Sequence, residues 1–369
     1  MKILLIGNYL SDCQESMQRF ADMLHSGLTK LNHEVRLLRP EPIFGRLKVS
    51  SPGLSKWLGY VDKFVLFPQT LQQAIAWADV VHICDHSNAM YTKYLQGVPH
   101  LVTCHDLLAI RSAFGEIKEN PTKWTGKQLQ NLIVRGLERS QRIVCVSQQT
   151  KKELLRLTRI NPQLVSIVYD GLNYTYAPVT EAEMLARCQA LGFNINSPFL
   201  LHVGGNHWYK NRLGVLTIFN HLRQYNSNIF LVMVGKPFTS DMHQFIQAHG
   251  LETQVKELVA VNNDDLQALY SAATALVFPS LQEGFGWPIA EAQACGCPVI
   301  TSNRPPMTEV AGDAAIYIDP ENSAAAAQII AQYLPNISKL KQAGFDNVQR
   351  FNPQKMLESY INVYQEICK

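Results

Sequence analysis

Apolar and polar positions along this chain predict strands and helices that follow one another. Short apolar runs, typical of buried parallel strands, occur at residues 2–6, 34–38, 80–84, 100–104, 142–147 and 165–169. A second set occurs at residues 198–203, 229–234, 255–261, 274–278, 299–300 and 315–318. Apolar residues spaced by three and four predict helices at 16–31, 128–139, 151–157, 212–225, 241–249, 322–334, 338–350 and 354–367. This alternation indicates an α/β fold with doubly wound parallel sheets.

Two stretches show neither pattern and are expected to be loops. Residues 40–60 are rich in proline and glycine, and residues 111–127 are polar. Cations alternate with aromatic residues at Lys48, Lys56, Trp57, Tyr60, Lys63, Phe64 and Phe67. Such a surface suits contact with a membrane interface or a lipid-linked molecule. The structural alternative is a packed helix with solvated lysines.

The length of 369 residues predicts two domains, divided near Asn173–Thr180. A hydrophobic share of 47% suits a globular protein, and a net charge of +3 gives no reason to expect nucleic-acid binding. The eight cysteines form no C-x-x-C pair, which indicates free thiols in a reducing compartment such as the cytoplasm. The opening apolar run is too short for a signal peptide, and no run approaches the length of a membrane span.

The stretch from Phe278 to Ile300 carries the most specific chemistry. Gly284 and Gly286 lie in a loop between a strand and a helix, where the absence of a Cβ lets a ligand approach the backbone. Backbone N–H groups at such a helix start bind anions, and Glu291, one turn further on, can accept two hydrogen bonds from a ribose diol. Glu283 precedes Glu291 with seven residues between them. The alternative is an ordinary strand–helix turn with exposed glutamates.

Lys210 follows another strand and the turn Gly204–Gly205. A compact cation at this place can neutralise a departing diphosphate. The alternative for Lys210 is a solvated loop residue. Asp264–Asp265 opens a helix and is interpreted as a cap formed by Asn263 or Asp264, so no required metal is predicted.

His105 follows a strand and is expected to face the ligand crevice of the first sheet. The structural alternative is a histidine that makes only local hydrogen bonds. For His82 and His86, near another strand end, we favour this structural interpretation.

The sequence E-G-F-G-W-P-I-A-E resembles the E-x7-E signature of retaining glycosyltransferases of the GT-B fold. Together with the A-x-A-C-G-C-P-V-I that follows, it is similar to glycosyltransferase family four, also described as glycosyl transferases group 1. G-G-N-H-W-Y-K-N resembles the family's glycine-loop-lysine element, and T-C-H-D-L resembles its N-domain histidine segment. The resemblance implies two Rossmann-like domains facing across a cleft: an acceptor-binding domain at 1–176 and a nucleotide-sugar domain at 177–352. It also implies that a helix at 353–369 returns to the first domain.

The resemblance further implies roles for individual residues. It assigns catalysis to His105, Lys210 and Glu283, with His105 and Glu283 holding the transferred sugar. The implied donor-binding residues are Gly204, Gly205, Lys210, Asn211, Lys236, Val261, Glu283, Gly284, Phe285, Gly286 and Glu291.

The chain departs from the family pattern at two places. The first loop, Asn8–Glu15, lacks the two adjacent glycines common in the family. Gly205 or Asn206 occupies the place of a phosphate-binding arginine. His207, Arg212 or backbone N–H groups are the candidates to replace it.

The expected function is metal-independent, retaining transfer of a hexose from a UDP- or GDP-linked sugar to a glycan, a lipid-linked acceptor or a small molecule. This function belongs to polysaccharide biosynthesis in the cytoplasm, with a possible contact between the N-terminal domain and the inner face of the membrane. The alternatives are a sugar-nucleotide epimerase of the same fold and a non-catalytic nucleotide-sugar-binding protein.

Overall fold

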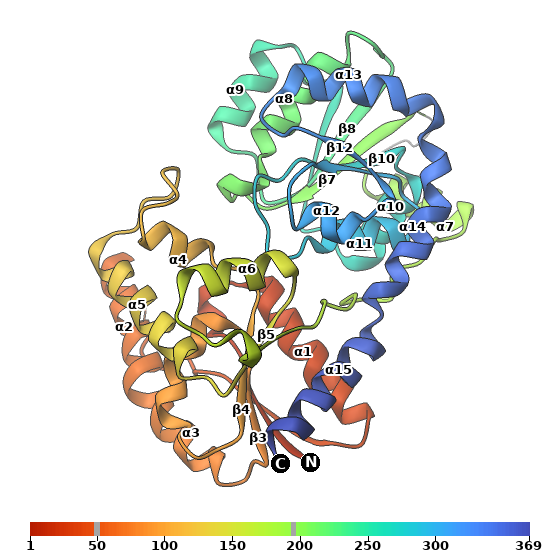
Figure 1. Cartoon of the computed structure of the whole chain (residues 1–369). Coiled ribbons are helices and arrows are strands. Elements are labelled where there is room, and N and C mark those ends of the chain that lie inside the picture. The colour runs from red at the N-terminus through yellow and green to blue at the C-terminus, as the bar shows by residue number, and fades with distance from the viewer. Residues whose placement is uncertain (48–51, 193–196) are drawn as a thin grey trace. The chain divides into compact units, whose positions relative to one another are not determined.

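The computed structural model describes residues 1–47, 52–192 and 197–369 (Figure 1). The chain divides into two compact units, the first formed by Met1–Asn173 with Pro353–Lys369 and the second by Tyr174–Asn352. Each unit contains a six-stranded sheet, and every paired strand runs parallel to its neighbour. The predicted α/β fold with two doubly wound sheets is confirmed.

The sheet of the first unit has the strand order β2-β1-β3-β4-β5-β6. Its strands are β1 (Lys2–Ile6), β2 (Glu34–Leu38), β3 (Val80–Ile83), β4 (His100–Cys104), β5 (Arg142–Cys145) and β6 (Val165–Ile167). The helices are α1 (Glu15–Lys30), α2 (Pro52–Val61), α3 (Phe67–Ile75), α4 (Leu108–Ala113), α5 (Trp124–Glu138), α6 (Gln148–Leu157) and α15 (Pro353–Ile367). Because strand side chains alternate between the two faces, each face of this sheet has its own core.

One of these faces packs against α3 and α5 through Leu4, Val81 and Val102. On the other face, where α1 and α15 lie side by side, Gly27 of α1 allows the close approach of Leu357 of α15 (Figure 1). A Cβ on Gly27 would lie 2.4 Å from a methyl group of Leu357. This packing joins the C-terminal helix to the first unit.

A buried polar network also fastens α15 to the first sheet. The His82 Nδ1 atom lies 2.8 Å from the Tyr364 hydroxyl, and its Nε2 atom lies 2.7 Å from the Thr103 hydroxyl. Thr103 in turn contacts the Tyr360 hydroxyl at 3.0 Å. Burial, followed by the charge of His105, lowers the pKa of His82 to about 3, so His82 stays neutral. His82 therefore has the structural role expected from the sequence.

We expect Tyr364→Phe to lower the free energy of unfolding by about 1–3 kcal/mol, because it leaves a ring nitrogen of buried His82 without its partner. Denaturant unfolding followed by circular dichroism measures this loss. The control is Tyr333→Phe, which removes a hydroxyl from a side chain that is 50% exposed and is expected to change the free energy by less than about 0.5 kcal/mol. Equal midpoints for the two variants would contradict the role of the network.

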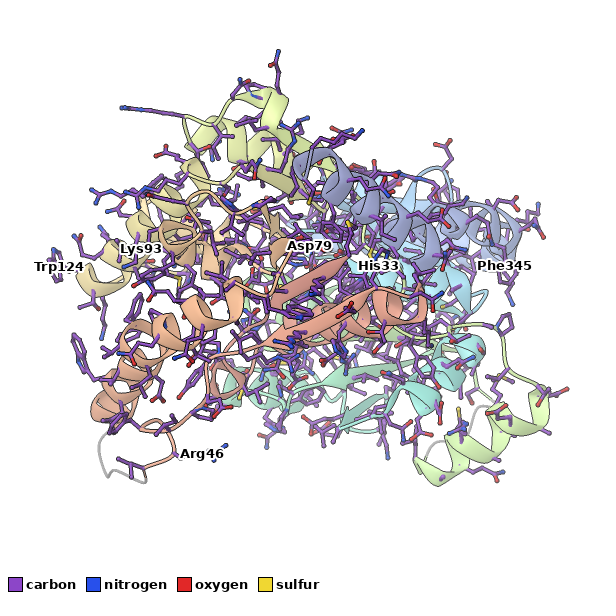
Figure 2. The ribbon with its side chains drawn as sticks, turned by 90° about the horizontal axis from the view of Figure 1, so that it is seen from below. His33, Arg46, Asp79, Lys93, Trp124 and Phe345 are labelled. Carbon is purple, nitrogen blue, oxygen red and sulfur yellow. The ribbon has the colours of Figure 1, made fainter. Side chains whose placement is uncertain are left out.

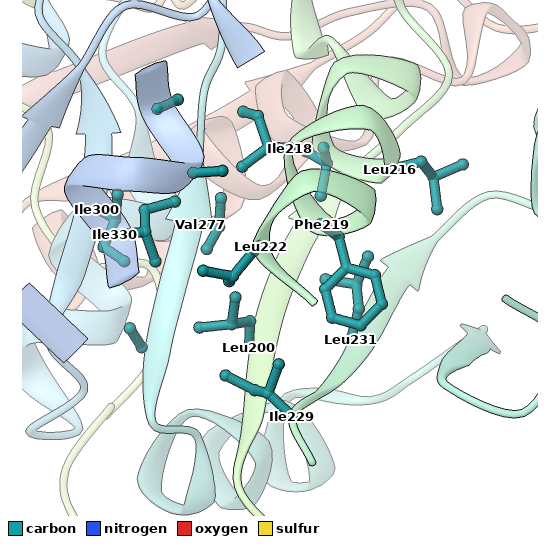
Figure 3. Packing of buried hydrophobic residues seen from close by; sticks show 14 of the residues in the cluster. Leu200, Leu216, Ile218, Phe219, Leu222, Ile229, Leu231, Val277, Ile300 and Ile330 are labelled. Atoms are coloured by element: carbon teal, nitrogen blue, oxygen red, sulfur yellow. The ribbon is translucent and has the colours of Figure 1, made fainter. Parts of the chain in front are cut away.

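The sheet of the second unit has the strand order β12-β11-β10-β7-β8-β9. Its strands are β7 (Phe199–Gly204), β8 (Phe230–Gly235), β9 (Val255–Val259), β10 (Ala275–Phe278), β11 (Val299–Ser302) and β12 (Ala315–Ile318). The helices are α7 (Glu181–Ala190), α8 (Arg212–Leu222), α9 (Ser240–Ala248), α10 (Asn263–Ala272), α11 (Trp287–Ala294), α12 (Met307–Ala311), α13 (Ser323–Tyr333) and α14 (Leu340–Val348). Side chains of α8 and α13, such as Phe219 and Ile330, pack against Leu200 and Val277 of the sheet (Figure 3).

Two expected loops are shorter than predicted, and one expected cap lies elsewhere. In the expected loop at 40–60, residues 40–47 form no helix or strand, but α2 begins at Pro52, since proline is favoured at the first helical position. In the expected loop at 111–127, residues 114–123 form a loop, whereas 111–113 end α4 and 124–127 begin α5. The cap of α10 is Asn262, whose side chain accepts a hydrogen bond from the Asp265 N–H, and neither Asn263 nor Asp264 forms it.

The mixed basic and aromatic segment after residue 47 is only partly a surface. Phe67 is buried in the core, and Lys63 pairs with Asp12 at 2.7 Å. Trp57, by contrast, is 61% exposed. Lys48 lies outside the described residues, and so does the side chain of Lys56. Trp124, at the start of α5, also projects away from the ribbon (Figure 2).

Candidate functional site

Each sheet has one point at which the strand order reverses, and ligands of open α/β sheets bind outside the carboxyl ends of the strands at that point. In the first unit it lies between β1 and β3, and in the second between β7 and β10. The loops that leave these four strands contain most of the residues singled out from the sequence. The candidate site is therefore described separately for each unit.

In the second unit, the loops after β7 and β10 are tied together. The Leu281 N–H donates to the Tyr209 carbonyl at 2.8 Å. Asn211, held in the left-handed conformation at φ 53°, donates from its side-chain amide to the Pro279 carbonyl at 3.1 Å. These contacts fix the positions of the side chains that the two loops carry.

Lys210 and Glu283 meet at this point. The Lys210 Nζ atom lies 2.7 Å from the Glu283 Oε1 atom, and the two side chains are only 17% and 8% exposed. The ammonium group also lies 5.2 Å from the centre of the Phe278 ring, within the range of a cation–π contact. A cation and a carboxylate from separate loops are thus brought together at the switch point, where they can bind a phosphate and a sugar hydroxyl.

Glu291 follows in α11, the helix that begins after the Glu283 loop. Gly286 precedes this helix at φ 105°, a conformation that favours glycine, and it has no side chain with which to cap the helix. Glu291 is 5% exposed, and its Oε2 atom accepts a hydrogen bond of 2.9 Å from the Tyr270 hydroxyl of α10. Burial and the charge of Glu291 raise the pKa of Tyr270 well above 10, so Tyr270 remains a donor. The orientation of the carboxylate is therefore set by a second helix.

The other predicted donor-binding residues are spread along the carboxyl edge of the same sheet. Gly204 ends β7, Gly205 follows it, and Lys236 comes directly after β8. Phe285, in the Glu283 loop between Gly284 and Gly286, packs edge-on against Phe351 with the ring centres 5.2 Å apart. Val261 lies between β9 and α10.

In the first unit, the loops after β1 and β3 meet through a buried carboxylate. The Asn8 side-chain amide donates to Asp85 Oδ2 at 2.6 Å, and His86 Nδ1 lies 3.0 Å from Asp85 Oδ1. Burial alone would raise the pKa of Asp85. The charge of His86 and the hydrogen bond to His86 lower the pKa by more than burial raises it, so the pKa lies well below its usual value. His86 thus belongs to a charged cluster, whereas His82 belongs to the core network.

His105 follows β4 and is 4% exposed. Its Nε2 atom lies 3.0 Å from the Cys84 carbonyl oxygen, and its Nδ1 atom lies 3.7 Å from Asp170 Oδ2. Phe20 packs edge-on against the ring with the centres 4.6 Å apart. Because both ring nitrogens face oxygen acceptors, the doubly protonated imidazolium is favoured. Burial lowers the pKa of His105, but the hydrogen bond and charge of Asp170 outweigh it and raise the pKa above 6.5.

We expect Asp170→Asn to lower the pKa of His105, because the substitution removes the largest of the interactions that raise it. The imidazole signals of the protein, followed by NMR during a pH titration, measure this shift. A histidine whose pKa is higher in the folded than in the unfolded protein stabilises the fold. This stabilisation is fully present at a pH below the pKa of the unfolded state, near 6.5, and is lost as the pH rises through the pKa of the folded state. The wild type should therefore lose more stability than Asp170→Asn across that interval. An unchanged titration of His105 in the variant would contradict the pairing.

Two partners of the site had not been singled out from the sequence. They are Tyr270, which donates to Glu291, and Asp170, which lies beside His105. Tyr270 lies 21 positions from Glu291 in the sequence. Neither the Tyr270–Glu291 pair nor the Asp170–His105 pair has a local spacing pattern that reveals it.

Comparison with known families agrees with this geometry. A model described as Glycosyltransferase Family 4 matches residues 17–176, and one described as Glycosyl transferases group 1 matches residues 188–347. The O-antigen chain mannosyltransferase B of Escherichia coli is 27% identical over 286 residues, which are 74% of this chain and 75% of that protein. The O-antigen chain mannosyltransferase RfbU of Salmonella typhimurium is 24% identical over 238 residues, which are 64% of this chain but only 61% of that protein.

Solved structures have the same fold over the whole chain. The HepE protein of Anabaena, solved in complex with UDP and glucose, aligns with a TM-score of 0.78 at 15% identity and covers 99% of this chain and 100% of its own. WaaG, a glycosyltransferase involved in lipopolysaccharide biosynthesis, aligns with a TM-score of 0.73 at 15% identity and covers 98% and 99%. The fold and these matches define a glycosyltransferase of the GT-B class. Within that class, the chain belongs to the family-four type.

Proposed function

We propose that this glycosyltransferase is a retaining hexosyltransferase that uses a nucleotide-diphosphate sugar and needs no metal. The observation that carries the proposal is the Lys210–Glu283 pair at the switch point of the second sheet, with Glu291 in the helix that follows the same loop. The Lys210 cation suits a diphosphate, the Glu283 carboxylate suits a hexose, and the oriented Glu291 carboxylate suits a ribose. The complexes of HepE with UDP and glucose and with UDP-glucose support this class of donor.

In the proposed reaction, the acceptor hydroxyl attacks the anomeric carbon on the face from which the diphosphate leaves. The bond between that carbon and the phosphate oxygen breaks, the bond to the acceptor oxygen forms, and the acceptor proton passes to the leaving diphosphate. Lys210 stabilises the charge that develops on the diphosphate. Glu283 is assigned to hold hydroxyl groups of the hexose.

We further propose a glycan or lipid-linked acceptor used at the cytoplasmic face of a membrane in polysaccharide biosynthesis. The names of the two O-antigen mannosyltransferases and of WaaG support this class of acceptor. Among the described residues, no helix combines the length and apolar character that crossing a bilayer demands. We also propose a peripheral contact between the first unit and that membrane.

The first unit carries a candidate surface for that contact. Ile43, Leu47, Trp57 and Val65 are between 53% and 61% exposed. The buried Asp62 accepts hydrogen bonds from the Phe44 and Gly45 N–H groups at 2.9 Å. These bonds hold the segment with Ile43 and Leu47 against the helical segment with Trp57 and Val65. Sedimentation with vesicles of anionic phospholipid tests the contact, and binding that survives unchanged in Trp57→Ser/Leu47→Ser would count against this surface.

The experiment that tests the donor class is thermal stabilisation by UDP, GDP, ADP and their sugars, with and without a chelator. A ligand at a hundred times its dissociation constant stabilises the folded state by about 2.7 kcal/mol. We expect one base to stabilise the protein clearly and the chelator to change nothing. Stabilisation by none of the nucleotides at millimolar concentration would overturn the proposal.

Product analysis by chromatography and NMR then tests the reaction itself. We expect a new glycoside with the anomeric configuration of the donor, formed only when a glycan or lipid-linked acceptor is present. Conversion of the donor sugar into an isomer without acceptor would instead indicate an epimerase. Nucleotide binding without any turnover would indicate a non-catalytic protein.

A further inference from the structure

Arg212, the first residue of α8, is buried but only half satisfied. It is 4% exposed, and its Nη1 atom donates to the Lys236 carbonyl at 2.7 Å and to the Asn206 side-chain oxygen. Its Nε and Nη2 atoms are buried and have no hydrogen-bond partner among the described residues. A charged donor buried without a partner is costly, so this edge of the guanidinium calls for an explanation.

The unpaired atoms form one recognisable unit. The Nε–H group and one Nη2–H group point in the same direction, and this is an edge with which arginine grips two oxygens of a phosphate or carboxylate. The negative charge of Glu257 favours the charged form of Arg212. The carboxylate of Glu257 itself accepts a hydrogen bond from the Phe238 N–H. The face of the guanidinium lies 5.3 Å from the centre of the Phe238 ring, a contact that leaves its N–H edge unused.

Arg212 also lies at the strand end that carries Lys210. Burial lowers the pKa of His202 in β7 to about 3, and the charges of both Arg212 and Lys210 lower it as well, so both cations act on the same imidazole. A Cβ on Gly204 would lie 3.1 Å from the His202 Nε2 atom and 3.6 Å from the Lys210 side chain. Two cations are thus held near the glycine turn after β7, and Glu283 pairs with Lys210.

We propose that Arg212 is the second cation of the diphosphate site and binds a donor phosphate through its Nε and Nη2 atoms. This inference rests on the proposed function. It selects Arg212 from the three candidates left open by the sequence. His207, another of them, is exposed and stacks on Tyr209 with the ring planes 4° apart.

The test compares ligands that differ only in their phosphates. Dissociation constants of the diphosphate, monophosphate and nucleoside are measured by calorimetry for the wild type, Arg212→Met and Arg212→Lys, with uridine or guanosine as the base, whichever binds the wild type. Arg212→Met should weaken diphosphate binding about tenfold to a hundredfold and leave nucleoside binding unchanged. Arg212→Lys keeps the charge but loses the two-pronged edge, so we expect an intermediate loss.

The control is Arg223→Met, which removes the arginine that caps the other end of α8 and should change none of the three affinities. Unchanged diphosphate affinity in folded Arg212→Met would overturn the proposal. An equal loss for nucleoside and diphosphate would also overturn it, because Arg212 would then only hold the loops at Asn206 and Lys236. If Arg212→Met does not fold, Arg212→Lys decides by the same two criteria.

Failure of this inference can be distinguished from failure of the proposed function. If the wild type binds no nucleotide, or if Lys210→Met and Glu291→Gln leave diphosphate affinity unchanged, the donor site itself is wrong. If those two variants lose affinity and the Arg212 variants do not, only the role of Arg212 is wrong.

Discussion

Lys210→Met is expected to lower kcat about a hundredfold to a thousandfold, because the charge that develops on the leaving diphosphate then loses a preorganised cation. Lys210 is well placed for this role, since its ammonium group is 2.7 Å from Glu283 Oε1 at the switch point between β7 and β10. Steady-state kinetics with the donor identified by the nucleotide panel measure the effect. Turnover within a few-fold of the wild type would contradict the assignment of Lys210 as a catalytic residue.

The same substitution also affects stability, and the two effects must be separated. Removing the cation leaves Glu283, which is 8% exposed, with a buried charge that lacks its partner, and this destabilises the fold. Lys210→Met/Glu283→Gln removes both charges, so its stability should recover while its kcat remains low. If activity recovered together with stability in the double variant, the loss in Lys210→Met would have been one of folding alone.

Lys210→Arg provides a conservative comparison. Arginine keeps the positive charge but spreads it over a planar group that is longer than the ammonium of lysine. The loops after β7 and β10 are joined by the hydrogen bond between the Leu281 N–H and the Tyr209 carbonyl, which limits how far they can move to admit a longer side chain. We therefore expect partial activity, with kcat reduced less than in Lys210→Met.

The central strands of both sheets could be predicted from the sequence because nearly all their residues are buried, as in β1, β4, β10 and β11. Such strands appear as short, nearly continuous apolar runs. The edge strand β2 alternates exposed and half-buried residues, and β1, β2, β4 and β12 begin and end at the predicted residues. The error at α2 has a local cause, since Gly53 and Gly59 were interpreted as helix breakers although both lie inside that helix. Composition alone does not reveal that the surrounding fold offsets the unfavourable helix propensity of glycine.

The site could be predicted only as far as its signals were local. Glu283 and Glu291 share one loop and helix, so their spacing was visible in the sequence. The partners that orient them come from other elements: Lys210 precedes α8, and Tyr270 lies on α10. The unpaired edge of Arg212 depends on where three separate segments place their acceptors. Only the folded chain shows such pairings, because they are set by packing and have no fixed spacing along the sequence.

Glu291→Gln is expected to weaken binding of the nucleoside diphosphate by about a hundredfold. Hydrogen bonds to a charged group contribute about 1.5–3 kcal/mol each, and the substitution removes the charge from both bonds to the ribose diol and replaces one acceptor oxygen by an NH2 donor. The substitution preserves the size of a side chain that is 5% exposed, so the effect on packing should be small. Calorimetry with the ribonucleotide and with its 2′-deoxy form measures both the loss and its origin, since Glu291→Gln should lose much less affinity for the deoxy ligand.

Tyr270→Phe tests how much of the contribution of Glu291 to donor binding depends on the orientation of its carboxylate. The variant removes only the hydroxyl that donates to Glu291 Oε2 at 2.9 Å, and phenylalanine fills the same buried space. We expect donor affinity to fall about fivefold to tenfold, because the carboxylate keeps its charge but loses its fixed orientation. The loss should be smaller for the 2′-deoxy ligand, as in Glu291→Gln. An unchanged preference for the ribonucleotide in Glu291→Gln would place ribose recognition elsewhere. A preference lost in Glu291→Gln but fully kept in Tyr270→Phe would limit Tyr270 to packing between α10 and α11.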